Sequence, residues 1–137
     1  MSVTHSGKLS NAAKLAALTY LITTPGDLYL GFATVAITSA STLATITEST
    51  HIGRFQMDDK LASAVLNGSD IPEIASNAGI TSGNASASGQ EIIAWFITTV
   101  PSASAGDIIA YGNGDAMYTN IGSAITITAG DLKIQID

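Results

Sequence analysis

Cysteine is absent from this chain, proline occurs three times, and charged side chains are few. Without cysteine, neither a disulfide nor a thiolate metal site can form. Cysteine usage therefore does not indicate whether the protein works in an oxidising or a reducing compartment. Five Lys and Arg against eleven Asp and Glu give a net charge of −6. Nucleic-acid binding needs clustered basic side chains, so this balance argues against such a partner. Charged residues make up only 12% of the 137, which favours a surface covered by neighbouring subunits.

A secretory signal is also missing, because the first eight residues contain no basic segment followed by an unbroken apolar run. The most apolar helical stretch, residues 12–22, is too short to span a bilayer and is interrupted by Lys14. We therefore expect no membrane partner and no passage through the usual secretory route.

The length predicts one domain that can bury roughly two-thirds of its unfolded surface. We expect a flexible N-terminal tail over residues 1–8 and a single domain over residues 9–137. Ser10 predicts the N-cap of a helix at about residues 11–22, ended by Pro25 and Gly26. Its apolar side chains recur at three- and four-residue spacing and are Leu15, Leu18, Leu21 and Ile22.

Period-two alternation predicts several short strands after this helix. The continuous apolar run from Glu91 to Val100 predicts a central strand buried on both faces. Residues 112–115 are expected to form a tight turn, and residues 67–89 are expected to be a loop. The pattern predicts an all-β fold, an antiparallel two-sheet β-sandwich that is jelly-roll-like and has one short N-terminal α-helix. The expected core consists of Leu28, Leu30, Phe32, Phe55, Trp95, Ile97, Ile109, Tyr111, Ile125, Ile127, Leu132, Ile134 and Ile136.

Catalytic signals are weak, so we expect no enzyme, no cofactor and no metal. His51 lies between Glu48 and Arg54, but no G-x-S-x-G spacing accompanies it, and we expect a surface or strand-edge position. The Gly-Asp pairs are typical of turns and lack the spacing of a Ca²⁺ loop. Trp95 is expected in the core, although with neighbouring aromatics it could also form a sugar-binding platform.

Four segments occur in an order that is similar to a known family. They are Pro25-Gly-Asp-Leu-Tyr-Leu-Gly-Phe-Ala-Thr34, Glu48-Ser-Thr-His-Ile-Gly-Arg54, Gly106-Asp-Ile-Ile-Ala-Tyr-Gly112 and Thr128-Ala-Gly-Asp-Leu-Lys-Ile-Gln-Ile-Asp137. They resemble the small β-sandwich structural proteins of tailed bacteriophages, which are labelled capsid decoration (cement), head fibre or tail fibre proteins. The resemblance runs from about residue 9 to the end, except residues 58–90.

This resemblance implies a non-enzymatic virion protein with no catalytic residues. We expect a capsid decoration protein on the capsid exterior, a homo-oligomer and most specifically a trimer, whose partner is the phage major capsid protein. The alternatives are a tail, fibre or baseplate component that binds tail proteins, a carbohydrate-binding module for the host surface, and a small hydrolase.

The two ends of the chain differ in charge. Residues 1–24 contain two Lys and no acidic residue, whereas the remainder has three bases and eleven acids, a net charge of −8. Such an asymmetry predicts an electrically distinct attachment end. The candidate subunit or capsid interface therefore consists of Lys8, Lys14, Leu15, Leu18 and Leu21. In the alternative interpretation, the helix only caps one end of the sandwich.

Overall fold

A computed structural model describes residues 6–23, 26–57 and 59–136 of the chain. Within these ranges it has one helix and nine strands, all paired antiparallel. In chain order they are α1 (Asn11–Thr23), β1 (Tyr29–Ala33), β2 (Phe55–Gln56), β3 (Val65–Leu66), β4 (Pro72–Ala75), β5 (Ile80–Asn84), β6 (Glu91–Thr98), β7 (Ala110–Tyr118), β8 (Ala124–Ile127) and β9 (Lys133–Gln135). The predicted all-β class with a single N-terminal helix is confirmed.

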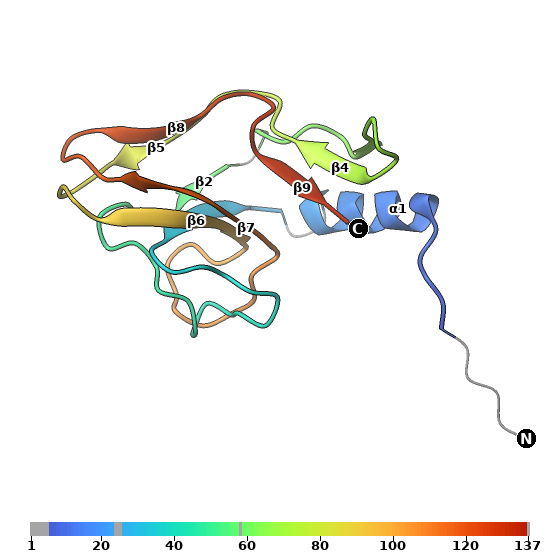
Figure 1. Cartoon of the computed structure of the whole chain (residues 1–137), viewed down its shortest axis with the longest axis horizontal. Coiled ribbons are helices and arrows are strands. Elements are labelled where there is room, and N and C mark those ends of the chain that lie inside the picture. Colours follow the sequence, from blue (N-terminus) through green and yellow to red (C-terminus); the bar gives the residue numbers. More distant parts are fainter. Residues whose placement is uncertain (1–5, 24–25, 58, 137) are drawn as a thin grey trace, which may run out of the picture.

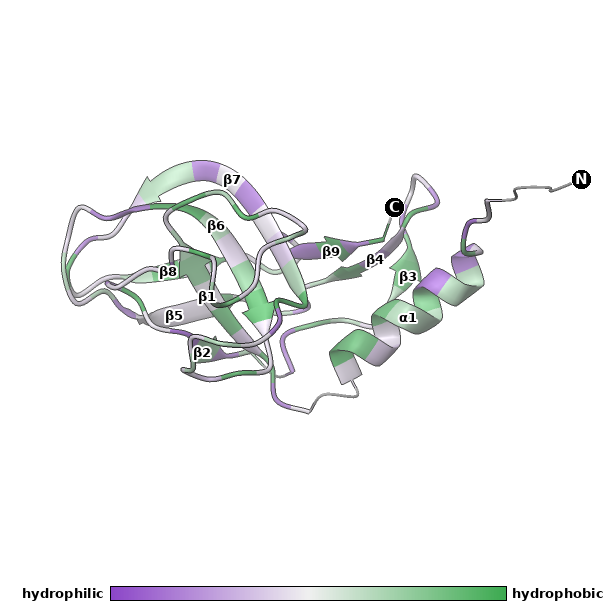
Figure 2. Ribbon diagram, turned by 90° about the horizontal axis from the view of Figure 1, so that it is seen from below, coloured by the Kyte–Doolittle hydropathy of each residue, from purple (hydrophilic) through white to green (hydrophobic). Residues whose placement is uncertain are grey.

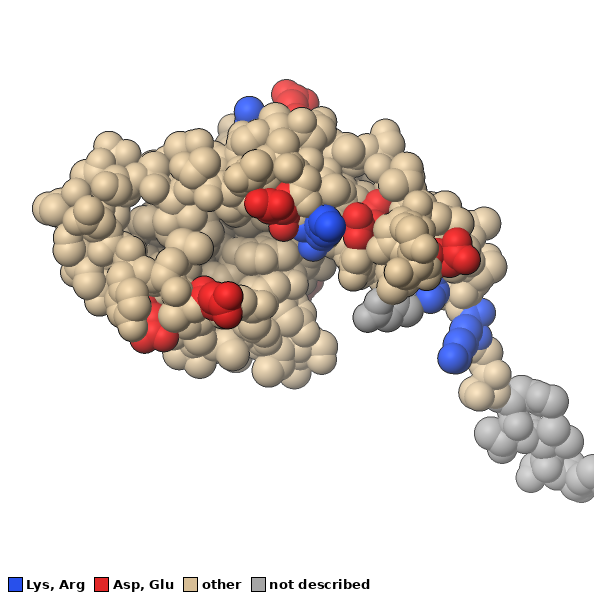
Figure 3. Space-filling model, turned by 45° about the horizontal axis from the view of Figure 1, so that its top comes forward, with Lys and Arg blue, Asp and Glu red and all other residues tan. Residues whose placement is uncertain are grey.

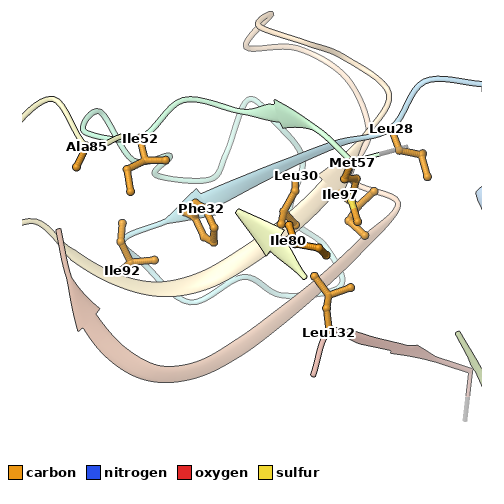
Figure 4. Packing of buried hydrophobic residues seen from close by; sticks show 10 residues of the cluster. All are labelled: Leu28, Leu30, Phe32, Ile52, Met57, Ile80, Ala85, Ile92, Ile97 and Leu132. Carbon is orange, nitrogen blue, oxygen red and sulfur yellow. The ribbon is translucent and has the colours of Figure 1, made fainter. Parts of the chain in front are cut away.

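The strands form a sandwich-like arrangement (Figure 1). One layer is a four-stranded sheet with the order β2-β1-β6-β7. The two-stranded sheet β5-β8 lies opposite it, and the three-stranded sheet β3-β4-β9 is separate from both. The main core lies between β1, β6 and the β5-β8 pair, and Figure 4 shows its ten buried residues, among them Phe32, Ile80 and Ile97.

Strand β6 is the centre of the fold, as the apolar run predicted. Its side chains belong to two separate hydrophobic clusters, one on each face of the four-stranded sheet. Ile92, Trp95 and Ile97 contribute to the main core, whereas Ala94 and Phe96 contribute to the second cluster. Strict alternation from Trp95 and Ile97 would put Ile92 on the opposite face from the main core. It faces the main core because the pairing with β7 shifts register between Ile92 and Ala94.

A long connection between β1 and β2 covers the outer face of the sheet. Ile37 and Leu43 in this connection are buried against Phe96. The Thr- and Ser-rich composition of residues 36–50 concealed these two anchors, because neither belongs to a regular helix or strand. The sheet is thus covered on both faces, one by strands and one by irregular chain.

Helix α1 belongs to a small lobe with β3, β4 and β9, beside the sandwich (Figure 2). The predicted N-cap is confirmed, since the Ala13 N–H donates to Ser10 Oγ at 3.2 Å. The apolar contact of the lobe includes Leu18 and Ile74, each 1% exposed. Pro25, the predicted helix terminator, lies outside the described residues, as do residues 1–5 of the predicted tail.

The segment 67–89, predicted as a loop, instead contains the strands β4 and β5. Pro72 is compatible with a strand here because it occupies the first position, where its missing N–H is tolerated. Ile74 and Ile80 are each 1% exposed and anchor these strands. Gly and Pro were therefore wrong indicators of a loop, since tertiary burial outweighed their local preference.

The predicted turn at residues 112–115 is also wrong, because it lies inside β7. The register places Ala110 and Gly112 opposite the inward residues Ile97 and Trp95. Tyr111, predicted in the core, is consequently turned to the other face and is 38% exposed. The other predicted core residues are buried or partly buried.

Candidate functional site

His51, for which the sequence predicts a surface or strand-edge position, is half-buried and hydrogen-bonded. Its Nδ1 lies 2.9 Å from Thr119 Oγ1, and its backbone N–H is bonded to the side chains of Ser49 and Gln90. These bonds join the connection before β2 to the ends of β6 and β7. In the described part of the chain, no group of three or more His, Cys, Asp and Glu could hold a metal ion.

Glu48 and Arg54 form a bidentate ion pair on the outer face of the sheet. The Arg54 Nε and Nη2 atoms lie 2.9 and 2.8 Å from the two carboxylate oxygens of Glu48. Arg54 Nη1 donates to the Val100 carbonyl at 2.8 Å, and the guanidinium lies 5.5 Å from the centre of the Phe96 ring. The Arg54 side chain is 2% exposed and Glu48 29% exposed. This pair therefore holds the β1–β2 connection against β6.

Glu73 in β4 is the titratable group with a distinct electrostatic setting. Hydrogen bonds from the side chains of Gln135 and Asn67, and the nearby Lys133, lower the pKa of its carboxyl group. Both hydrogen bonds reach its Oε2 atom. The carboxylate thus links the loop after β3 to β9 and has the role of a sheet contact.

Several exposed apolar side chains lie on the elements of the α1 lobe, and together they are called here the lobe surface. It consists of Tyr20, Leu21, Val65 and Leu66, each between 39% and 64% exposed. Helix α1 is apolar on most sides, and only Leu18 is fully buried. A helix that is apolar all round is usually covered on more than one side. The lobe surface therefore has the character of a contact surface.

The predicted interface residues fall into three groups. Lys8 and Leu21 are exposed, and Lys14 and Leu15 are half-buried. Leu18 is 1% exposed within a single chain, so it is not available for contact with another subunit or a capsid. Val65 and Leu66 extend the exposed part of this surface, and their two-residue strand was too short to predict from sequence.

Charge is sparse over the molecule (Figure 3). Basic side chains lie at the end that carries the N-terminal arm, residues 6–10, and also at the centre and the top of this view, and most of the visible surface is neutral. No helix in the described ranges is both long and apolar enough to span a bilayer.

A cleft of about 310 Å³, called here the β7 cleft, opens between the two layers of the sandwich. Its walls are mainly apolar and are formed by Phe32, Ile92, Ile93, Ala94, Trp95, Gly114, Met117, Ile125, Ile127 and Leu132. Two carboxylates, Asp115 and Asp131, also line it. A second groove of about 570 Å³ separates α1 from β9 and the start of β7.

These sites offer surfaces and clefts for contact, and the polar residues that could suggest catalysis are used to join segments of the fold. The sequence had indicated the α1 face but had missed the contribution of β3 and the whole β7 cleft. No protein-family model matches the chain, and no curated protein matches it either.

Proposed function

We propose that this protein is a non-enzymatic structural protein of a tailed-phage virion, and specifically a capsid decoration protein that docks on the assembled major capsid protein. The observation that carries the proposal is the lobe surface, which exposes large apolar side chains at one end of a small β-sandwich. Large exposed apolar surfaces mark sites of interaction. The resemblance of the four sequence segments to phage structural proteins supplies the class of partner.

The mechanism is mechanical. A preformed sandwich covers the junction between neighbouring capsid subunits, and the added interface opposes outward pressure on the shell. The low charge of the chain suits such a role, because the centres of interfaces are depleted in charged residues. In this role the protein acts on the capsid exterior as a homo-oligomer.

The test compares capsid binding by two matched variants. Leu21→Asp introduces a charge into the lobe surface, whereas Val35→Asp introduces the same charge at an apolar residue that is 54% exposed on the sandwich. Co-sedimentation with undecorated capsids should be lost for Leu21→Asp and kept for Val35→Asp. Equal binding by both folded variants would contradict docking through the lobe surface.

The alternatives give different outcomes. A tail or fibre component would be located on the tail in images of particles and would not bind undecorated capsids. A host-surface carbohydrate-binding module would bind a glycan array, either through Trp95 or through residues 58–90. Trp95 is partly buried and packs against the main core, so its ring is not a free platform.

A further inference from the structure

We propose that the β7 cleft binds the N-terminal arm, residues 6–10, of a second copy of this chain, so that subunits associate head to tail. The inference goes beyond attachment to a capsid, because it concerns the contact between copies of the protein. It rests on the shape and charge of two regions at opposite ends of the molecule.

The first region is the edge of the four-stranded sheet. Strand β7 pairs with β6 on one side, and no described strand pairs with it on the other side. It is nine residues long and carries a single charged residue, Asp115. Long edge strands with so little charge are templates for pairing with another chain. The edge is thus available to an added segment.

The β7 cleft lies directly beside this edge. Ile92, Trp95 and Ile125 are among its apolar walls, and Asp115 and Asp131 supply its charges. None of the residues that line it is basic. An occupant that suits the cleft therefore combines an apolar side chain with a positive charge.

The arm has this combination. Its sequence is Ser-Gly-Lys-Leu-Ser, in which Leu9 is 61% exposed and Lys8 is also exposed. All five residues are exposed, and the arm leads away from the rest of the chain (Figure 1). Residues 6–23 contain Lys8 and Lys14 and no acidic residue. The charge of the arm is complementary to that of the cleft.

The arm of the same molecule is badly placed to fill its own cleft. Helix α1 has 13 residues and is about 20 Å long. The arm leaves from the end of this helix that is remote from the sandwich, and β8 lies on the far side of the sandwich in Figures 1 and 2. A second copy is therefore the source of the arm, and strand addition at a free edge is a common way to bind such a segment.

Leu9 then enters the apolar part of the cleft. The Lys8 side chain leaves an extended arm on the opposite face, and its flexible stem bends over the rim of the cleft so that the ammonium group pairs with the carboxylates of Asp115 and Asp131. Each subunit donates one arm and accepts another. Such a heterologous contact closes into a ring when the rotation between subunits permits it. In a closed trimer, each of the three clefts would bind the arm of one neighbouring subunit.

The first test uses the absence of cysteine from the chain. Two single variants, Leu9→Cys and Met117→Cys, are mixed and oxidised, and disulfide-linked heterodimers are measured. Ile121→Cys replaces Met117→Cys in the control mixture, because Ile121 is 64% exposed and does not line the cleft. We expect linked heterodimers in excess in the first mixture. Equal yields in the two mixtures would overturn the proposal.

The second test reverses the charges, with molar mass in solution measured by light scattering in the absence of capsids. Lys8→Glu should dissociate the assembly, as should the pair Asp115→Lys and Asp131→Lys, whereas the control Lys60→Glu should not. Combining Lys8→Glu with the two acceptor substitutions should restore it. A monomeric native chain, or an assembly unchanged by Lys8→Glu, would overturn the arm contact and leave the capsid-binding test unaffected.

Discussion

The indole ring of Trp95 in β6 lies across Gly112, its register partner in β7. A Cβ atom at position 112 would lie 2.6 Å from the indole Cε2 atom. The opposite face of β6 repeats this relationship, since the ring of Phe96 covers Gly31, its partner in β1. Two consecutive aromatic residues thus lie over glycines of two different strands. Both glycines serve close packing, and neither has the positive φ that a turn would require.

Gly112→Ala should therefore destabilise the protein. The added methyl group overlaps the indole ring, and overpacking of this kind costs about 1–3 kcal/mol. Gly114→Ala in the same strand is the matched control, because a Cβ there meets nothing within 4 Å. Denaturant unfolding should show a loss for Gly112→Ala and little change for Gly114→Ala. A neutral Gly112→Ala would mean that the Trp95 ring can move aside.

The Glu48–Arg54 pair predicts an asymmetric response to substitution. Glu48→Gln leaves Arg54, whose side chain is 2% exposed, without its carboxylate partner. The substitution should lower the free energy of unfolding by about 1.5–3 kcal/mol. In an Arg54→Met background the same change should cost much less, because the buried charge is already gone. Urea unfolding of the single and double variants measures the coupling. Additive effects would show that the pair contributes little.

The Asn113 side chain links β7 to the connection between β1 and β2, which covers the outer face of the sheet. Its side-chain Nδ2 donates to the Ile37 carbonyl, and its Oδ1 accepts from the Ile37 N–H, both at 2.8 Å. Asn113→Ala leaves two backbone groups of a buried residue unpaired and should cost about 1–3 kcal/mol. Asn84→Ala, at an exposed strand position, is the control. Equal stability of the two variants would argue against the link.

The lowered pKa of Glu73 predicts a contribution to stability that depends on pH. Because the folded state favours the carboxylate, this contribution is present above the pKa of the unfolded state and is lost as pH falls through the folded pKa. The midpoint temperature of thermal unfolding should therefore fall more steeply on acidification for the native chain than for Glu73→Gln. In Gln135→Ala the main cause is removed, and the Glu73 pKa followed by NMR should rise. An unchanged pKa would contradict the role of Gln135.

The elements that could be predicted from sequence are those whose pattern repeats locally. Ser10 and the apolar spacing that follows predicted α1 to within a residue, because capping and helical periodicity act over a few positions. The apolar run at 91–100 predicted β6 as a central strand, since burial on both faces leaves no polar alternation. The all-β class followed from these patterns and their spacing.

The candidate sites were less accessible to prediction. The sequence indicated Lys8, Lys14 and the α1 leucines, but it did not distinguish Leu18, which is buried within the chain, from Leu21, which is exposed. Both belong to the same apolar spacing. Only the position of β4 decides which side of the helix is covered.

The sequence by itself determined the helix, the central strand and the uneven distribution of charge, because each depends on neighbours along the chain. Tertiary structure alone decided that Gly112 faces Trp95, that Tyr111 points outward, and that Pro72 begins a strand. It also brought Asp115 and Asp131 to the same cleft. These features arise from contacts between residues far apart in sequence, where strand register and burial outweigh local preference.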